Sequence, residues 1–218
     1  MTSFPQAHVP DHPLIGHHLA KCRDKATGTP EFRAAVVSLG QFLTYECCRD
    51  WLPTRKVMVP TPLEVEAPAT IVDNTRQVEI VPILRAGLAL VEGCLPLLPD
   101  AKILHVGYRR DEETAQATCY LTRLPAQLPQ EARYLILEPM LATGGTLIQV
   151  LDAMHARGAK QELVRVVSLI ASQPALERLA AHYPDVQVFC AAIDAEVDSR
   201  SFIVPGLGDA GDRAFGTE

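Results

Sequence analysis

The segment from Tyr134 to Thr146 has the residue types that phosphate binding requires. It reads YLILEPMLATGGT: an apolar run, an acid, and then small residues and hydroxyls that lead into a helical pattern. Small residues let backbone N–H groups converge on an anion, and the N-terminus of the following helix adds positive potential. The chain has no GxxxxGK[ST] sequence, so this is not a P-loop. The segment predicts phosphate binding, and an ordinary strand-to-helix turn is the alternative.

The elements that must position this segment alternate along the chain. Strand-like apolar runs are found at 78–84, 102–107, 134–137, 164–170 and 186–191, and helical patterns at 88–98, 146–157 and 174–182. This alternation predicts an α/β fold of three layers, a mostly parallel sheet with helices on both faces. Open sheets of this kind bind ligands at the carboxyl ends of their strands, which is where the phosphate-binding segment would lie.

The remaining segments frame this core. Residues 1–28 predict an arm with a short helix, and Thr29-Pro30 predicts the start of a long helix, with the Thr29 hydroxyl as its cap. Residues 53–70 contain four prolines and predict loops and short edge strands. We expect a single domain over 1–218, made of an arm and helix (1–52), a core (77–192) and a Gly-rich tail (193–218).

Composition and charge exclude several classes of protein. The net charge is −6, with 20 Lys plus Arg against 26 Asp plus Glu, so no basic excess suggests a nucleic-acid partner. The six cysteines form no CxxC pair, which favours free thiols in a reducing cytoplasm. No secretory signal or apolar run of about 18 residues is present, so we expect no membrane contact. His12, His17 and His18 lack the spacing of a metal motif.

Three motifs together resemble those of the uracil phosphoribosyltransferases, a type I phosphoribosyltransferase family. EPMLATGGT at 138–146 is similar to the family's phosphoribosyl-diphosphate loop, and VPILRAG at 81–87 and IVPGLGDAGD at 203–212 are similar to its other hallmarks. A weaker resemblance runs from His12 through 43–46 to Thr217 and so covers almost the whole chain. It implies a type I phosphoribosyltransferase-like fold whose tail binds the base, and the transfer of phosphoribose from 5-phospho-α-D-ribose 1-diphosphate to uracil, giving UMP.

The resemblance also implies a role for each matching residue in binding the phosphoribosyl donor. Glu138 would hold the ribose hydroxyls, Arg85 and Arg110 would meet the diphosphate, and Ala142–Thr146 would cradle the 5-phosphate. Glu138, Arg110 and Asp209 are the implied catalytic residues. The full set for the donor is Arg85, Arg110, Glu138, Pro139, Met140, Leu141, Ala142, Thr143, Gly144, Gly145, Thr146 and Asp209.

The tail is implied to bind uracil through Ile203, Gly208, Asp209 and Ala210. Fixed backbone groups that match the O2–N3–O4 edge of uracil would leave unpaired groups against cytosine, a mismatch that can discriminate by about 10⁴ or more. Mg²⁺ is the implied cofactor, held mainly by the substrate diphosphate rather than by protein ligands. We further expect the polar segment Asp111–Thr122 to act as a lid.

The chain departs from the family pattern at four positions. It has Glu138, Thr146, Phe202 and Ala89 where the family normally has Asp, Ser, Tyr and Gly. The alternatives to this enzyme are a phosphoribosyltransferase for another base, a regulatory protein that binds without turnover, and an unspecified α/β domain. The N-terminal arm and long helix predict a homodimer or higher homo-oligomer.

Overall fold

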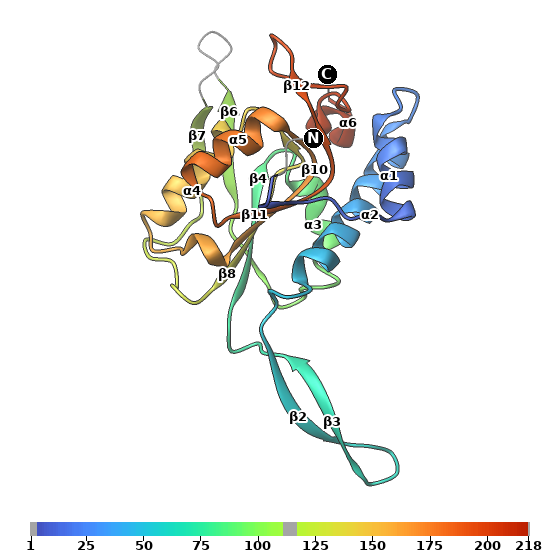
Figure 1. Cartoon of the computed structure of the whole chain (residues 1–218), viewed down its shortest axis with the longest axis vertical. Helices are drawn as coiled ribbons and strands as arrows, with labels where there is room; N and C mark the ends of the chain where they lie inside the picture. The colour runs from blue at the N-terminus through green and yellow to red at the C-terminus, as the bar shows by residue number, and fades with distance from the viewer. Residues whose placement is uncertain (1–3, 111–116, 218) are drawn as a thin grey trace.

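A parallel β-sheet runs through the centre of the computed structural model, which describes residues 4–110 and 117–217 (Figure 1). Within these residues the strand order is β1-β11-β10-β8-β4-β6-β7, with β5 beside β4 and β9 beside β10. The described pairings of this sheet are parallel except that of β6 with β7. Its strands are β1 (Ala7–His8), β4 (Val78–Leu84), β5 (Lys102–Ile103), β6 (Val106–Arg110), β7 (Ala117–Thr122), β8 (Arg133–Leu137), β9 (Met140–Leu141), β10 (Val164–Ser172) and β11 (Gln187–Asp194).

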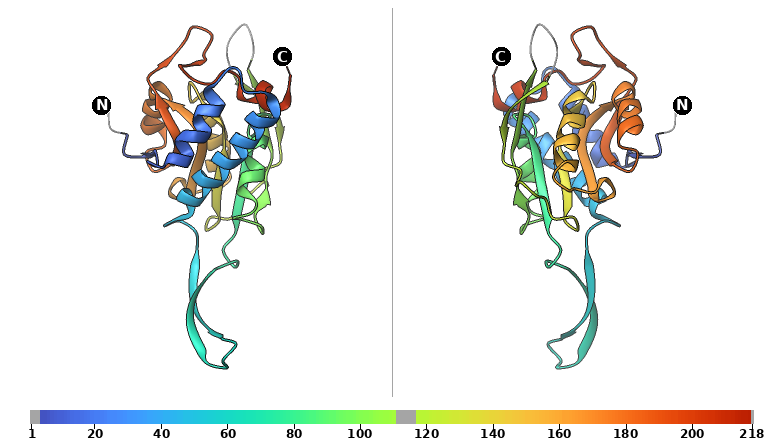
Figure 2. Two further views of the ribbon diagram at one scale, coloured as in Figure 1. Left: turned by 90° about the vertical axis from the view of Figure 1, so that its right-hand side faces the viewer. Right: turned by 90° about the vertical axis from the view of Figure 1, so that its left-hand side faces the viewer.

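Helices cover both faces of this sheet (Figure 2). One face carries α1 (Pro13–Arg23), α2 (Thr29–Cys48), α3 (Leu88–Cys94) and α6 (Ala210–Phe215), and the other carries α4 (Gly145–His155) and α5 (Gln173–His182). Successive side chains of β8 point to opposite faces of the sheet. Leu135 and Leu137 therefore pack in the core on one face, and Tyr134 and Ile136 pack in the core on the other. The expected three-layer α/β architecture is confirmed.

Residues 53–70 differ from the prediction of edge strands. Strands β2 (Thr54–Pro60) and β3 (Glu66–Val72) pair antiparallel with each other as a separate sheet and project away from the body (Figure 1). Both faces of this hairpin are largely open, and Leu63 at its tip is 84% exposed. The alternating β-formers therefore satisfy their backbone groups locally and never join the edge of the main sheet.

The start of α2 and the strand predicted at 102–107 also differ from the prediction. Gly28, not Thr29, is the N-cap of α2: its carbonyl accepts from the Phe32 N–H at 2.9 Å, and Thr29 is already helical. The single strand predicted at 102–107 is two short strands, because β5 pairs near the start of β4 and β6 pairs at its end.

Other expectations about single side chains can be compared with the structure directly. All six cysteines are free thiols, as predicted. His12 Nδ1 accepts from the Leu14 N–H at 3.1 Å and so caps α1. Among the residues that the structure describes, none of the helices combines the length and the apolar character that a membrane span requires.

Glu79 on β4 is a buried carboxylate outside the predicted site. It is 2% exposed, and its Oε2 has no hydrogen-bond partner among the described residues. Burial raises the pKa of this carboxyl, and the nearby Lys102 opposes the rise only in part. Because the folded pKa lies above the unfolded value, stability is greatest below the unfolded pKa and is lost as the pH rises through the folded pKa.

We therefore expect Glu79→Gln to unfold at a higher temperature than the wild type at pH 7, with the difference disappearing toward pH 4. Each kcal/mol gained should raise Tm by about 2–4 °C in a chain of this size. Thermal unfolding followed by circular dichroism from pH 4 to pH 8 checks this, with the exposed Glu177→Gln as control. A loss of stability that is equal at every pH would contradict it.

Candidate active site

The phosphate-binding segment lies where three elements meet. Its Glu138 follows β8 directly and donates its N–H to the Val167 carbonyl at 3.1 Å. Met140 and Leu141 then form β9 beside β10. Gly144 has a left-handed φ of 71°, which side chains disfavour, and caps the N-terminus of α4. The backbone thus turns from the sheet into a helix N-terminus, the geometry that phosphate binding requires.

Two residues of the neighbouring α5 region lie at this loop and were not found from the sequence, and one of them, Ser172, supports the loop. Ser172 Oγ donates to the Ala142 carbonyl at 2.5 Å and accepts from the Ala175 N–H at 3.1 Å, so it caps α5 and holds the loop. Arg178 Nη1 lies 3.5 Å from the position that a Cβ on Gly145 would occupy. Local spacing carries no signal for these contacts, because the packing of α5 creates them.

Arg85 follows β4 at the same end of the sheet. Its guanidinium pairs with Asp212, with 3.1 Å between Nη2 and Oδ1. A Cβ on Gly87 would lie 2.5 Å from the Leu137 carbonyl oxygen, so only glycine lets this turn pack against the end of β8. The turn that carries Arg85 therefore lies beside Glu138.

The tail reaches this end through a small antiparallel pair, β12 (Glu196–Val197) with β13 (Ile203–Val204). Gly206 and Gly208 have φ of 57° and 82°, and Asp209 Oδ1 caps α6 by accepting from the Asp212 N–H at 2.9 Å. Residues 206–211 also have the GxGxxG spacing. Because the strand before them belongs to a two-stranded antiparallel pair, they lack the βαβ setting of a dinucleotide-binding turn.

These three segments line one cavity of about 360 Å³. All four residues predicted to bind the base contribute to it, together with two residues of the loop 138–146, here called the phosphate loop, and the neighbour of Arg85. The lining consists of Ala86, Met140, Ala142, Arg200, Ser201, Phe202, Ile203, Gly208, Asp209, Ala210 and Gly211. Residues far apart in sequence thus line the same cavity.

The remaining predicted residues are not part of this lining. Gly145 and Thr146 form the first turn of α4, and Ala89 is buried in α3. Arg110 ends β6. Of the predicted lid, residues 111–116 lie outside the described residues, and 117–122 form β7, which pairs with β6.

The cavity is bordered by an exposed turn of the tail, which contributes Arg200 and Phe202 to its lining. Asp198 Oδ1 accepts the backbone N–H groups of Phe202 and Arg200 at 2.8 and 2.9 Å. The Phe202 N–H is the main cause of a pKa of Asp198 below its usual range. Phe202 is 39% exposed and lies 5.5 Å from the Arg200 guanidinium carbon, measured to its ring centre. The turn therefore presents an aromatic ring and a cation beside the cavity.

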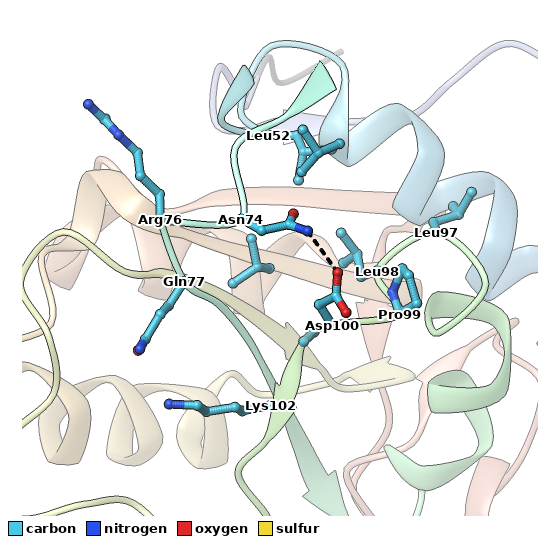
Figure 3. A pocket seen from close by; sticks show the side chains of 12 residues that line it. Leu52, Asn74, Arg76, Gln77, Leu97, Leu98, Pro99, Asp100 and Lys102 are labelled. Carbon is cyan, nitrogen blue, oxygen red and sulfur yellow. Dashed lines mark hydrogen bonds between the residues drawn. The ribbon is translucent and has the colours of Figure 1, made fainter. Parts of the chain in front are cut away.

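A second cavity, of about 350 Å³, lies at the opposite end of the sheet (Figure 3). It is lined by Val78 and Lys102, at the starts of β4 and β5, and by Asn74, which donates to Asp100 at 2.9 Å. Ligands of open α/β sheets bind at the carboxyl ends of the strands. The cavity formed by the three motifs is therefore the candidate active site.

Comparisons with known proteins agree with this geometry. The family model described as uracil phosphoribosyltransferase matches residues 9–217. A uracil phosphoribosyltransferase of Synechococcus elongatus is 52% identical over 209 residues, 96% of each chain. One of a Nostoc species is 50% identical over 217 residues, with both chains fully covered.

Solved structures support the same assignment. A structure of an Aquifex aeolicus protein superposes with a TM-score of 0.86 at 34% identity and covers 96% of this chain and 97% of that one. An adenine phosphoribosyltransferase of Trypanosoma brucei, at 13% identity and a TM-score of 0.56 over 87% of this chain and 84% of that one, shares the fold. Because the family model and relatives at half identity span nearly the full length, this chain belongs to the uracil phosphoribosyltransferase family.

Proposed function

We propose that this protein transfers the phosphoribosyl group of 5-phospho-α-D-ribose 1-diphosphate to N1 of uracil, giving UMP and diphosphate. The observation that carries the proposal is the single cavity in which the phosphate loop, the turn beside Arg85 and the tail meet. A donor phosphate on the loop and a base on the tail would share this space. Their reacting atoms would then be held together, which lowers the barrier without a protein nucleophile.

The donor is held through charge and backbone dipoles. The 5-phosphate lies at the N-terminus of α4, on the loop 142–146. Arg85, which is exposed, exchanges its partner Asp212 for the diphosphate, whose several oxygens suit a guanidinium fork. Glu138 accepts hydrogen bonds from the ribose hydroxyls, and its charge stabilises the positive charge that develops on the ribose ring as diphosphate leaves.

Uracil is recognised mainly by the backbone of Ile203 and 208–210. The left-handed turn at Gly208 and the cap of α6 by Asp209 fix the directions of these backbone groups. Fixed donors and acceptors match uracil and leave unpaired groups against cytosine. Specificity for the base is therefore a property of loop geometry.

Mg²⁺ fits this site as an ion shared with the substrate. Asp209 supplies a carboxylate at the cavity, and the described residues contain no group of three or more His, Cys, Asp or Glu side chains that could hold a metal alone. Mg²⁺ commonly takes one or two carboxylates and completes its shell with substrate phosphates and water. When bound, the ion would neutralise charge on the diphosphate.

The exposed hairpin β2–β3 supports a homodimer or higher homo-oligomer. Its apolar side chains Met58, Leu63 and Val65 are 54%, 84% and 64% exposed. Apolar side chains that are exposed together on one element are typical of a surface that binds another protein chain. Light scattering that gives the monomer mass at every concentration would contradict this assembly.

The six free thiols support a reducing, cytoplasmic location, which fractionation of cells can test.

The activity is tested by incubating the protein with the donor, Mg²⁺ and, in parallel, uracil, cytosine, hypoxanthine or adenine. We expect UMP from uracil alone, and we expect a chelator to abolish it because the diphosphate then keeps its full charge. Anion-exchange chromatography resolves the products, and restoring Mg²⁺ is the control. Donor binding without any nucleotide product would support a regulatory protein instead.

A further inference from the structure

Arg23 and Asp194 form a partly buried ion pair outside all three motifs. Arg23 ends α1, and Asp194, at the end of β11, is only 7% exposed. The pairing is bidentate, with 2.8 Å between Nη1 and Oδ2 and 2.7 Å between Nη2 and Oδ1. Burial alone would raise the pKa of Asp194, but hydrogen bonds from Arg23 and from the Gly206 N–H outweigh it and hold the pKa below its usual range. The carboxylate therefore stays ionised at neutral pH.

Both partners also hold the backbone of Gly206. Arg23 Nη1 donates to the Gly206 carbonyl at 2.9 Å, and the Gly206 N–H donates to Asp194 Oδ2 at 2.9 Å. The two backbone polar groups of one residue are thus fixed by a single charged pair. Charge-assisted bonds of this kind are shorter and stronger than neutral ones and set geometry closely.

Gly206 lies between Ile203 and Gly208, both of which line the cavity. Gly206 has a left-handed φ of 57°, and a Cβ placed on it would lie 2.1 Å from the Ile203 carbonyl oxygen. The turn is therefore so tight that only glycine fits at this position. Arg213 holds the carbonyl of the next residue, because its Nη1 donates to the Leu207 carbonyl at 2.8 Å while its Nη2 donates to the backbone carbonyl of Asp24 at 2.7 Å. Residues 203–208, here called the base loop, are therefore attached to the end of α1 at two successive residues.

We propose that Arg23 and Asp194 are positioning residues for the base: by fixing Gly206 they set the backbone groups that bind uracil, and so they set its affinity. The proposal rests on the proposed function. Neither residue lines the cavity, so both act through the loop. Since recognition by backbone depends on placement, a small shift of residues 203–208 weakens uracil binding and leaves the phosphate loop on the other side of the cavity in place.

The test is steady-state kinetics of Arg23→Lys, which keeps the charge but loses the fork, and Asp194→Asn, which keeps the shape. We expect KM for uracil to rise roughly tenfold or more, because a misplacement of about 1 Å can cost 10²-fold. KM for phosphoribosyl diphosphate should stay within about twofold of the wild type, since the phosphate loop keeps its supports.

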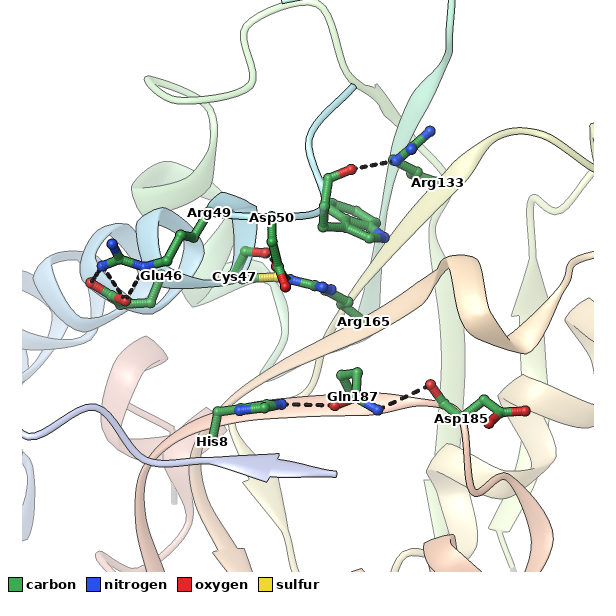
Figure 4. Close-up of polar contacts among 10 residues, drawn as sticks. His8, Glu46, Cys47, Arg49, Asp50, Arg133, Arg165, Asp185 and Gln187 are labelled. Carbon is green, nitrogen blue, oxygen red and sulfur yellow. Dashed lines mark hydrogen bonds and ion pairs between the residues drawn. The ribbon is translucent and has the colours of Figure 1, made fainter. Parts of the chain in front are cut away.

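Arg165→Lys is the matched control. Arg165 is 11% exposed in its side chain, pairs with Asp50 at 2.8 Å between Nη1 and Oδ1, and donates to the Cys47 carbonyl (Figure 4). It therefore resembles Arg23 in chemistry but holds the C-terminal end of α2 rather than the base loop. We expect this control to lower Tm and to leave both KM values unchanged.

The outcomes separate the two proposals. If the wild type makes no UMP, the proposed function itself fails. If it does, and the Arg23 and Asp194 variants lose Tm but keep the wild-type KM for uracil, as the control does, the positioning role is overturned. Should a single variant fail to fold, the paired change Arg23→Met with Asp194→Leu leaves no lone buried charge. That protein must show the same selective rise in KM for uracil, and an unchanged KM overturns the proposal.

Discussion

Arg85→Met is expected to lower kcat/KM for phosphoribosyl diphosphate by about 10²–10³-fold, the usual cost of removing one fixed group that stabilises developing charge. Arg85 leaves β4 beside the end of β8, and its side chain is 59% exposed, so it is available to a ligand. Its pair with Asp212 is an exposed one, of a kind worth about 0–1 kcal/mol. Thermal stability should therefore hardly change.

Initial rates with each substrate varied in turn, together with Tm, check this expectation. Arg49→Met is the matched control, because Arg49 is 67% exposed and pairs with Glu46 at 2.8 Å but lies at the end of α2. Methionine keeps much of the length of the side chain in both variants. If Arg85→Met and Arg49→Met have the same kinetic constants, Arg85 does not bind the donor.

The central strands were predictable because burial on both faces leaves continuous apolar runs. Strand β4 has the bounds that its sequence predicted, Val78–Leu84, and β8 differs only by beginning at Arg133. Helix α3 is shorter than predicted: it ends at Cys94, with Leu95 as its C-cap, because the next residue, Pro96, has no N–H to donate to a further turn.

The hairpin was harder to predict for the opposite reason. Register and partner are strongly specified only where one face of a strand is buried, and β2 and β3 bury neither face of the hairpin in this chain. Their sequence shows strand-forming residues but carries no signal for which strand they pair with. The partner is therefore known only from the three-dimensional arrangement.

The candidate site also has one part that the sequence predicts and one part that it does not. The turn at Gly144 and the following helix could be predicted, because glycine and hydroxyl chemistry acts between neighbours in sequence. The contacts that hold the two loops of the site could not. Ser172, which holds the Ala142 carbonyl, and the Arg23–Asp194 pair, which holds Gly206, act across the fold, and a single sequence contains no periodicity that joins them to these loops.

The backbone around Glu138 is fixed on both sides, so the effect of substituting this side chain can be separated from a shift of the backbone. The Glu138 N–H donates to Val167 at 3.1 Å, and the Pro139 carbonyl accepts from the Leu169 N–H at 2.9 Å and from Ser168 Oγ at 3.0 Å. The sheet therefore sets where the carboxylate starts. Substitutions here should change the side chain's chemistry more than its placement.

Glu138→Gln is accordingly expected to lower kcat by a factor on the order of 10²–10³ and to leave KM for uracil nearly unchanged. The amide keeps the length of the side chain but removes the negative charge that we propose faces the ribose ring, so the loss should fall on the transition state. Glu138→Asp keeps the charge and withdraws it by one methylene, so its rate should lie between those of Gln and the wild type. Rates at saturating substrates check this, with the exposed Glu92→Gln on α3 as control. If Gln at this position retained the wild-type kcat, charge on residue 138 would play no part in the transfer, and the fork of Arg85 and the helix N-terminus would have to supply the stabilisation.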